Sequence, residues 1–393
     1  MRRFSANYVL PVTCPPIKNG IVEVDNNGEI ISIVDPGREF QEIHSTEFHN
    51  GVIVPGFVNA HCHLELSHLK GQVKSGSGIA GFIKAVTEYR INDSEVIEKA
   101  IQLAIREIEL TGTVAVGDIC NTLDTFFLKS RSSIFFHNFI EVFGINPLAA
   151  ERIIENANGI MRGFEKLQNS STSITPHSTY SLSNTLWKTV REHINKSNLP
   201  VSIHYAESLP EFEYLMNGTG PLMERYRLLN IPFDVPFERT PFKVITDNIN
   251  HNKDVLFIHN TFASVEELVE LNRIYRKATF VTCPESNLII EGKLPDLVSM
   301  YKHGLRIAIG TDSLASATSL SMLHHIKLLL DNFTDIPFSE ILKWSTLNGA
   351  EALNVSGRFG SIEIGKAPGL NLITNFDFDK MCPRVNSEVR RLI

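Results

Sequence analysis

The sequence predicts an α/β protein, a (β/α)8 barrel of the TIM type with a small β-domain beside it. Short apolar runs rich in Val, Ile and Phe recur through the middle of the chain, and each is followed by a polar turn and a stretch with helical periodicity. An open doubly wound sheet gives the same local signals and is the alternative. The eight runs, in chain order, are Val52–Asn59, Thr113–Asp118, Ser133–Val142, Ser173–Pro176, Pro200–His204, Val255–His259, Thr279–Cys283 and Arg306–Gly310.

The helices are predicted from apolar residues that recur with three-and-four spacing. Ser94–Leu110 is the clearest, because its apolar residues form one stripe. Gly76–Gly81 spells G-x-G-x-x-G, but it follows a polar segment rather than a buried strand, so it does not indicate a dinucleotide site. We expect a flexible loop there, at the barrel mouth, with a helix beginning at Phe82. The other predicted helices are Thr185–Ile194, Val265–Tyr275 and Leu320–Leu330.

The two ends of the chain have a different pattern from the middle. Gly20–Val24 and Glu29–Val34 flank an Asn-Asn-Gly turn signal, which predicts a hairpin. Residues 359–374 repeat this style of short runs separated by glycines. We therefore expect residues 1–54 and 355–393 to form one small β-domain and residues 55–354 to form the barrel.

Composition restricts the function classes. The chain has 393 residues, 43% of them apolar, and a net charge of −7, which argues against broad electrostatic capture of nucleic acid and favours a small-molecule partner. No segment approaches the roughly 18 continuous apolar residues of a membrane span. Prolines and polar residues after Met1–Arg3 interrupt any signal-peptide core. The five cysteines are scattered and never spaced C-x-x-C, so we expect reduced thiols in the cytoplasm.

The first apolar run leads into a cluster of polar residues, His61-Cys62-His63-Leu64-Glu65. Side chains alternate across an extended strand, so His61 and His63 point the same way and can share a metal ion. An H-x-H pair alone is weak support for a metal site. Glu65 has the same parity and should face the same cavity, provided that the chain does not turn first.

Three later runs also have polar residues at, or just after, their carboxyl ends. The fifth ends at His204, with Glu207 three residues on, the sixth ends at His259, and the eighth is followed by Asp312. Each is ordinary by itself, because strand ends meet solvent. Together, His204, Asp312 and the H-x-H pair supply three nitrogens and one oxygen from three strands. Zn²⁺, or a similar divalent ion with an open water position, prefers such a set.

These motifs resemble those of the amidohydrolase superfamily, and within it the branch of aminohydrolases that contains adenosine-type, guanine and cytosine deaminases and triazine chlorohydrolases. The resemblance covers most of the chain, and the motifs match in order and spacing. It implies a distorted (β/α)8 barrel with a small β-sandwich domain built from both termini. The matching segments are Pro55–His63, Pro176–Ser178, His204–Glu207, His259–Asn260, Gly310–Ser313 and Gly360–Lys366.

The resemblance also implies a metal centre. Members with two metals usually bridge them with a modified lysine at the end of the fourth strand, and no lysine lies between Ser173 and Leu182. One divalent ion is therefore expected, with zinc favoured and iron or manganese as alternatives. Homodimers are common in this branch, which makes a homodimer the expected assembly. The implied metal ligands are His61, His63, His204 and Asp312.

The same comparison implies roles in catalysis. Glu207 would protonate a ring nitrogen of an aromatic amine, and His259 would hydrogen-bond the attacking hydroxide and the developing oxyanion. Asp312, with its second oxygen free, would take a proton from the metal-activated water and pass it to the leaving group. His177 would contact substrate, and its alternative is a structural histidine at a strand end. This division of roles is typical of hydrolytic deamination with release of ammonia.

The predicted substrate is an adenine-type nucleoside. His63-Leu64-Glu65-Leu66-Ser67 resembles the group that deaminates 6-amino-6-deoxyfutalosine in the alternative menaquinone pathway, and Glu65 would then bind substrate. The same motifs also suit a chlorohydrolase or cyclic-amide hydrolase on the same scaffold, a guanine- or cytosine-type deaminase, and a metal-binding protein without turnover. The presence of Glu207 and His259 beside a full ligand set disfavours a protein without turnover.

The segment 208–253 is long for a connection between a strand and a helix, which indicates a function. Its aromatic and apolar side chains predict either a lid that stacks on a nucleobase or the packing of surface helices. They are Phe212, Tyr214, Met216, Tyr226, Phe233, Phe237 and Phe242.

Overall fold

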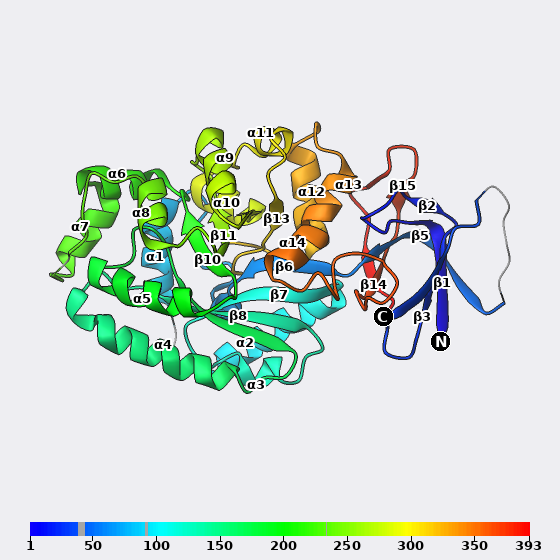
Figure 1. The fold of residues 1–393 in the computed structure, drawn as a ribbon, viewed down its shortest axis with the longest axis horizontal. Helices are drawn as coiled ribbons and strands as arrows, with labels where there is room; N and C mark the ends of the chain where they lie inside the picture. The colour runs from blue at the N-terminus through cyan, green and yellow to red at the C-terminus, as the bar shows by residue number, and fades with distance from the viewer. Residues whose placement is uncertain (38–43, 91–92, 233) are drawn as a thin grey trace.

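The structure is a computed structural model that describes residues 1–37, 44–90, 93–232 and 234–393. A barrel surrounded by helices lies beside a separate β-sheet that contains both ends of the chain (Figure 1). The predicted α/β class with a (β/α)8 barrel and a small β-domain from both termini is confirmed. Within the described ranges, no helix is both long and apolar enough to cross a membrane.

The barrel is distorted, because its strands form two parallel half-sheets. Between the described residues of the two halves, the pairing at the seams consists of isolated bridges, Ser178 to His204 and Cys62 to Asp312. Both seams therefore pass through residues predicted to bind metal. One half-sheet contains β6 (Phe57–Cys62), β7 (Thr113–Cys120), β8 (Phe135–Val142) and β9 (Ser170–Pro176), and the other contains β10 (Val201–Tyr205), β11 (Asp254–His259), β12 (Lys277–Thr282) and β13 (Ile307–Ile309).

The helices follow the apolar stripes of the sequence. Helix α2 (Ser94–Leu110) has the predicted bounds, begins at the N-cap Asp93 and buries one face of the stripe. α1 (Gly78–Tyr89) begins four residues before the predicted start at Phe82, so Gly78–Gly81 of the expected loop is helical, and α12 (Met322–Asn332) begins two residues after the predicted start at Leu320. The remaining helices are α3 (Phe126–Lys129), α4 (Ala150–Phe164), α5 (Asn184–Lys196), α6 (Leu209–Asn217), α7 (Gly220–Leu228), α8 (Pro241–Asn248), α9 (Val265–Ile274), α10 (Pro284–Glu291), α11 (Leu297–Lys302), α13 (Phe338–Trp344) and α14 (Leu347–Ala352).

The terminal β-domain is built on one sheet with strand order β17-β14-β5-β1-β3-β4 and β2 paired to β1. The predicted hairpin forms between β3 and β4, and Gly28 in its turn has a φ of 80°, which favours glycine. Phe4, Val22 and Ile53 are among the side chains in its core. The strands are β1 (Arg2–Val9), β2 (Ile17–Lys18), β3 (Ile21–Val24), β4 (Ile30–Val34), β5 (Thr46–Pro55), β14 (Leu370–Ile373) and β17 (Val389–Arg391), with a separate ribbon of β15 (Phe376–Asp377) and β16 (Cys382–Pro383).

The first predicted strand, Val52–Asn59, is two strands rather than one. Its beginning lies in β5 of the terminal sheet and its end lies in β6 of the barrel, and the chain changes sheets at Gly56. A Cβ atom on Gly56 would lie 2.5 Å from the carbonyl oxygen of Pro368, so only glycine fits this crossing. The apolar pattern continues through the crossing because both strands are buried there. The sequence pattern therefore did not indicate where one strand ends and the next begins.

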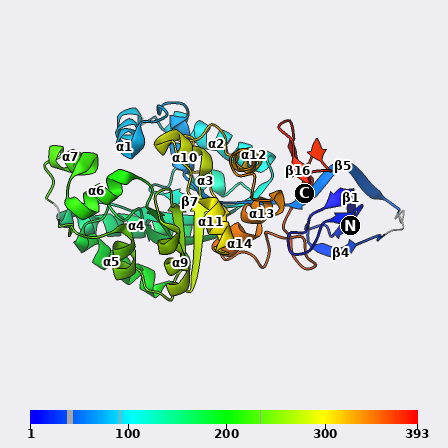
Figure 2. The same ribbon diagram turned by 90° about the horizontal axis from the view of Figure 1, so that it is seen from above.

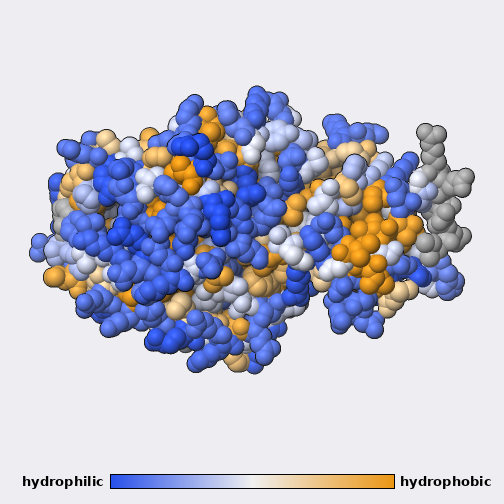
Figure 3. Space-filling view, in the orientation of Figure 1, coloured by the Kyte–Doolittle hydropathy of each residue, from blue (hydrophilic) through white to orange (hydrophobic). Residues whose placement is uncertain are grey.

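Helices α6 and α7 lie at the end of the molecule opposite the terminal sheet, with α1 near them in both ribbon views (Figures 1 and 2). The surface over the barrel is mostly hydrophilic in the face that Figure 3 shows, while an apolar area lies over the terminal domain.

Candidate active site and metal centre

The four predicted metal ligands converge at the carboxyl ends of the barrel strands. The Nε2 atoms of His61 and His63 are 3.1 Å apart, and His63 Nε2 is 3.6 Å from Asp312 Oδ1. The rings of His61 and His204 have their centroids 5.0 Å apart. His61 at the end of β6 and His204 on β10 are buried, as is Asp312 after β13. The expected alternation of His61 and His63 onto one side is therefore what the structure has.

The protonation states of these imidazoles suit metal binding. Burial and the neighbouring histidines hold the pKa of His61 well below its ordinary value. Burial lowers the pKa of His63 to about 4, against the opposing effect of Asp312, and burial also lowers the pKa of His204. These three side chains are therefore neutral near pH 7, the form that coordinates a metal ion.

Hydrogen bonds fix the orientation of two of the ligands. The Nδ1–H of His204 donates to the carbonyl oxygen of His177 at 2.8 Å, which leaves its Nε2 for a metal ion. Asp312 Oδ2 accepts from the hydroxyls of Ser286 at 2.5 Å and Ser316 at 2.8 Å. The prediction of a free second oxygen on Asp312 is therefore wrong. The other oxygen, Oδ1, faces His63. No described residue donates a hydrogen bond to Oδ1, so this oxygen is the one available to coordinate a metal ion or to accept a proton.

The donor set fits a divalent cation. His61, His63 and Asp312 offer ligand atoms that all lie within 4.8 Å of one another, and so do His61, His204 and His259. The imidazole nitrogens of the buried His61 and the partly buried His63 face each other at 3.1 Å. Three nitrogens and one carboxylate oxygen in this arrangement are typical of zinc and related ions.

The backbone at the site is held in a conformation that side-chain-bearing residues seldom adopt. Ala206, His259 and Asp312 have φ angles of 46°, 72° and 59°. Each left-handed residue costs about 1–3 kcal/mol, so the surrounding fold must stabilise it. The turns direct the chain away from β10, β11 and β13 just where the site residues occur.

Glu207 follows β10 and is buried. Its Oε1 accepts a hydrogen bond from the hydroxyl of Tyr180 at 2.6 Å, and its Oε2 is 3.7 Å from His259 Nε2. Burial raises the pKa of Glu207, although His259 and the Tyr180 hydroxyl lower it. The carboxyl is thus suited to hold a proton at a higher pH than an exposed glutamate and to donate it.

His259 and His177 face the same cavity from the ends of β11 and β9, the strands on either side of β10. The Nδ1–H of His259 donates to Asn287 Oδ1 at 2.7 Å, so its Nε2 points toward Glu207. His177 pairs through Nδ1 with Ser181 Oγ at 3.0 Å and stacks on His204 with centroids 4.6 Å apart. Both histidines line the cavity.

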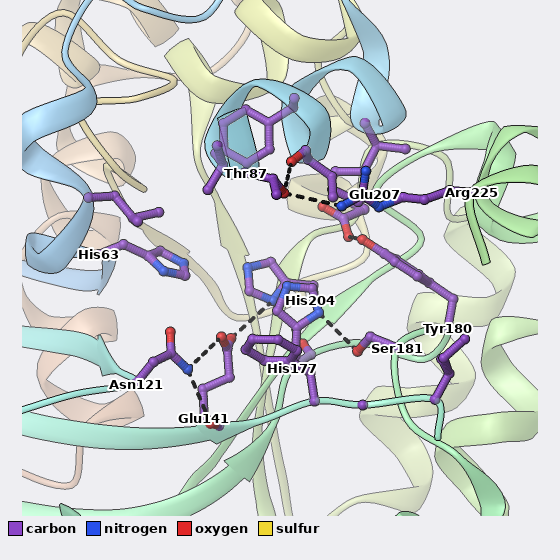
Figure 4. Close-up of a pocket in the computed structure, with 18 of the residues that line it drawn as sticks. His63, Thr87, Asn121, Glu141, His177, Tyr180, Ser181, His204, Glu207 and Arg225 are labelled. Atoms are coloured by element: carbon purple, nitrogen blue, oxygen red, sulfur yellow. Dashed lines mark hydrogen bonds and ion pairs between the residues drawn. The ribbon is translucent and has the colours of Figure 1, made fainter. Parts of the chain in front are cut away.

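The site opens into a cavity of about 490 Å³, within the range of sites that enclose a drug-sized ligand. The walls are mostly apolar, with polar groups concentrated near the histidines, as Figure 4 shows for the side chains of His63, His204 and Glu207. The apolar lining includes Leu66, Ile79, Phe82, Ile83, Val86, Phe143, Ile145, Leu229, Ile231 and Ile290. The predicted position of the Gly76–Gly81 segment at the cavity mouth agrees with Ile79 in this lining.

The segment 208–253 contributes both to the cavity wall and to the packing of the fold. Tyr226 lines the cavity, whereas Tyr214 is buried in the barrel's hydrophobic core and Phe212 packs against that core. Phe237 and Phe242 also pack against the core, Met216 is 39% exposed, and Phe233 lies outside the described residues. Of the described members of the set, Tyr226 is the one that lines the cavity.

The structure does not bring Glu65 together with the other predicted site residues. The chain turns directly after His63 into a short 3-10 helix, Leu64–Leu69, so the strand parity no longer applies. The Glu65 carboxylate accepts hydrogen bonds from the backbone N–H groups of Asn121 and Thr122 and from the Thr122 hydroxyl, at 2.8–3.1 Å. It is not part of the cavity lining, and it stabilises the turn after β7.

Glu65→Ala is therefore expected to lower the free energy of unfolding by about 1–3 kcal/mol, because two partly buried N–H groups lose their acceptor, and to leave KM unchanged. Chemical denaturation and steady-state kinetics measure the two effects, with Glu98→Ala on the exposed face of α2 as the control. A raised KM at unchanged stability would restore the predicted contact with substrate.

The sequence analysis did not identify several residues of the site. Tyr180 holds Glu207, and Glu211 is fully buried and accepts from the backbone N–H of Glu207 at 2.9 Å. Burial raises the pKa of Glu211 to about 8. Glu141, at the end of β8, lines the cavity 3.8 Å from His204 Nδ1. Its position at a strand end was visible in the sequence, but no motif marked it, and Tyr180 and Glu211 depend on loop geometry.

Comparison with known proteins gives the family. The model of the amidohydrolase family matches residues 52–387. The chain belongs to the amidohydrolase family. Among curated amidohydrolase relatives, the adenosine deaminase of Helicobacter pylori is 29% identical over 349 residues, 85% of this chain and 81% of the relative. The aminodeoxyfutalosine deaminase of Nitratiruptor sp. is 27% identical over 332 residues, 82% of this chain and 79% of the relative.

Solved structures agree with this membership. The aminofutalosine deaminase of Helicobacter pylori, in complex with methylthio-coformycin, superposes with a TM-score of 0.83 at 26% identity, over 97% of this chain and 94% of that chain. Atrazine chlorohydrolase of Arthrobacter aurescens, complexed with zinc, has a TM-score of 0.75 at 15% identity and shares the fold. The amidohydrolase assignment makes this chain a hydrolytic enzyme, as the sequence predicts.

Proposed function

We propose that this enzyme hydrolytically deaminates an adenine-type nucleoside, with 6-amino-6-deoxyfutalosine as the leading candidate, using one divalent metal ion, zinc by preference. The relatives named for adenosine and aminodeoxyfutalosine support this substrate class. The observation that carries the proposal is Glu207, a buried carboxyl with a raised pKa beside His259 and next to the four-ligand cluster. A ring nitrogen needs such a proton donor before its neighbouring carbon accepts a nucleophile.

The residues would share the proton transfers as follows. His61, His63, His204 and Asp312 would hold the metal ion, which when bound lowers the pKa of water toward about 7. Glu207 would donate a proton to the ring nitrogen next to the carbon that carries the amine. Asp312 Oδ1 would accept one proton from the attacking water and pass it to the amine, which leaves as ammonia. The ring would keep the oxygen as a carbonyl, and the second proton of the water would return to the Glu207 carboxylate.

Two histidines would stabilise and orient the reacting groups. His259 Nε2 would hydrogen-bond the oxygen that develops negative charge, a contribution comparable to other oxyanion donors at about 3 kcal/mol. Its partner Asn287 fixes the ring, since it accepts from Nδ1. His177, which lines the cavity on the far side of the His204 ring, would contact the bound nucleoside.

A parallel assay tests the proposal. Purified enzyme, with its metal content quantified, is expected to release ammonia and reduce absorbance at the adenine wavelength with 6-amino-6-deoxyfutalosine, adenosine or thio-substituted adenosine derivatives, but not with guanine. We expect about one transition-metal ion per chain, from the single four-ligand set. Activity confined to chlorinated triazines or cyclic amides, from protein that contains the metal, would reject deamination.

A further inference from the structure

Glu211 is a buried acid that the proton transfers proposed above do not use. It is the third residue of α6, it is completely buried, and it does not line the cavity of the active site. Removing a carboxyl from water is costly unless hydrogen bonds compensate for the lost hydration. The partners of this carboxyl therefore indicate what the buried acid does.

The first set of partners belongs to the loop that carries Glu207. Glu211 Oε2 accepts the backbone N–H of Glu207 at 2.9 Å, and Glu211 Oε1 accepts the backbone N–H of Ala206 at 3.3 Å. Ala206 has a φ of 46°, so the chain turns sharply between the end of β10 and Glu207. A carboxyl that accepts both N–H groups stabilises this left-handed turn and fixes the point from which the Glu207 side chain extends.

The second partner belongs to the turn after β9. The hydroxyl of Thr179 donates to Glu211 Oε1, and the next residue, Tyr180, donates from its hydroxyl to Glu207 Oε1 at 2.6 Å. Figure 4 shows the Tyr180 hydroxyl at the Glu207 carboxyl. The other oxygen, Glu207 Oε2, lies 3.7 Å from His259 Nε2. Glu211 is thus connected to the backbone of Glu207 directly and to its carboxyl through the Thr179–Tyr180 turn.

These contacts differ from those of an ordinary helix cap. In a capping box, an acid at the third position of the helix accepts the N–H of the N-cap residue, which is Ser208 in α6. Glu211 instead bonds the two residues that precede Ser208. An acid in the first turn also stabilises a helix when it is exposed. Capping therefore does not account for a completely buried carboxyl with three donors.

We propose that Glu211 is a positioning residue for the acid: it keeps Glu207 Oε2 directed at the ring nitrogen, while Glu211 itself touches neither the substrate nor the metal ion. This inference rests on the proposed function, because it assumes that Glu207 protonates a substrate. Orientation contributes a large factor to rate, and a displacement of about 1 Å can cost on the order of 10²-fold. Since the alignment matters for the chemical step, kcat should depend on Glu211 more than KM does.

A double-variant cycle with Glu207 tests this role in metal-containing enzyme. Glu211→Gln keeps the size of the side chain but places an amide NH₂ group against one of the two backbone N–H groups. We expect it to lower kcat by about 10- to 100-fold, with little change in KM or metal content. In the Glu207→Gln background the same change should have no further effect on kcat, because the acid that it positions is gone. Glu213→Gln, the same substitution at an exposed position of α6, is the control and should behave as wild type.

Thr179 provides a milder pair of variants if Glu211→Gln does not fold. Thr179→Val removes the hydroxyl that donates to Glu211 and keeps the shape of the side chain. It should lower kcat by about 3- to 10-fold, the effect of one hydrogen bond, and again only when Glu207 is present. Thr179→Ser keeps the hydroxyl and should keep the wild-type rate.

Wild-type kcat in the folded, metal-containing Glu211→Gln or Thr179→Val protein would make Glu211 a purely structural residue and overturn the inference. An equal loss of kcat with and without Glu207 would also overturn it, because independent effects multiply. The cycle can be measured on any substrate that the enzyme hydrolyses. The expected non-additivity on a chlorinated triazine or a cyclic amide, without deamination, would refute the proposed function alone, and absence of all turnover would refute both.

Discussion

Glu207→Gln should lower kcat by on the order of 10² or more while the protein keeps its metal ion. Glutamine has the same shape and can still accept the hydrogen bond that Tyr180 donates to Oε1, so the loop after β10 should keep its conformation. The variant loses only the proton that the carboxyl would deliver to the ring nitrogen. Steady-state kinetics and metal analysis on the same preparation measure both quantities.

The pH dependence of this variant adds a second measurement. A general acid works in its protonated form, so the wild-type rate should fall as pH rises through the pKa of Glu207. Burial raises that pKa, which keeps the carboxyl protonated to a higher pH than an exposed glutamate. In Glu207→Gln this alkaline decline should disappear, because the amide does not titrate.

A matched control separates the loss of the acid from a general effect of charge removal. Glu213 lies on α6, is exposed, and does not line the cavity, so Glu213→Gln should leave kcat and its pH profile unchanged. Unchanged turnover in Glu207→Gln would remove Glu207 from the mechanism. Loss of metal together with activity would show that it supports the metal centre instead.

The strands and the positions of the candidate metal ligands could be predicted from the sequence because each signal is local. A buried parallel strand is a continuous apolar run, and its carboxyl end is marked by a sudden polar residue, as at His204 or His259. The H-x-H pair required only the alternation of one extended segment. Convergence of the set in space followed from the barrel itself, since all its strands end on the same face.

The errors arose where the chain turns. Glu65 lies two residues after His63, so in a longer strand both side chains would have pointed to the same face. Instead, a 3-10 helix begins at Leu64. Gly56 changes sheets inside a single apolar run. The partners of Asp312 Oδ2 come from Ser286 and Ser316, whose hydroxyls carry no sequence signal for this role. Hydrogen-bond partners of the site depend on the tertiary arrangement, which a single sequence did not specify.

Lys129→Met should reduce the free energy of unfolding by about 3–5 kcal/mol, because it leaves a buried carboxylate without its counter-charge. Lys129 Nζ lies 2.6 Å from Asp118 Oδ2, and both side chains are fully buried. Nζ also donates to Asn138 Oδ1 at 2.7 Å. Burial lowers the pKa of Lys129, but the charge of Asp118 outweighs it and raises the pKa above the ordinary value, so the lysine remains charged.

This pair is connected to the candidate metal centre. Asp118 Oδ1 accepts the backbone N–H of Leu64 at 2.9 Å, and Leu64 directly follows His63. Loss of Lys129 should therefore disturb the loop that positions His63 and weaken metal affinity by about 10- to 100-fold, as partners of metal ligands typically do. Metal competition with a chelator measures this effect separately from denaturation.

The double variant Asp118→Asn/Lys129→Met distinguishes the buried charge from simple loss of packing. It contains no unpaired charge, and the amide oxygen can still accept from Leu64, so it should regain most of the stability and metal affinity that Lys129→Met alone loses. Lys188→Met, at an exposed position of α5, is the control for removing a lysine and should behave as wild type. If the double variant is as unstable as the single one, the defect is a packing defect around Phe136 and Phe164, whose rings contact the ammonium, and the electrostatic explanation is wrong.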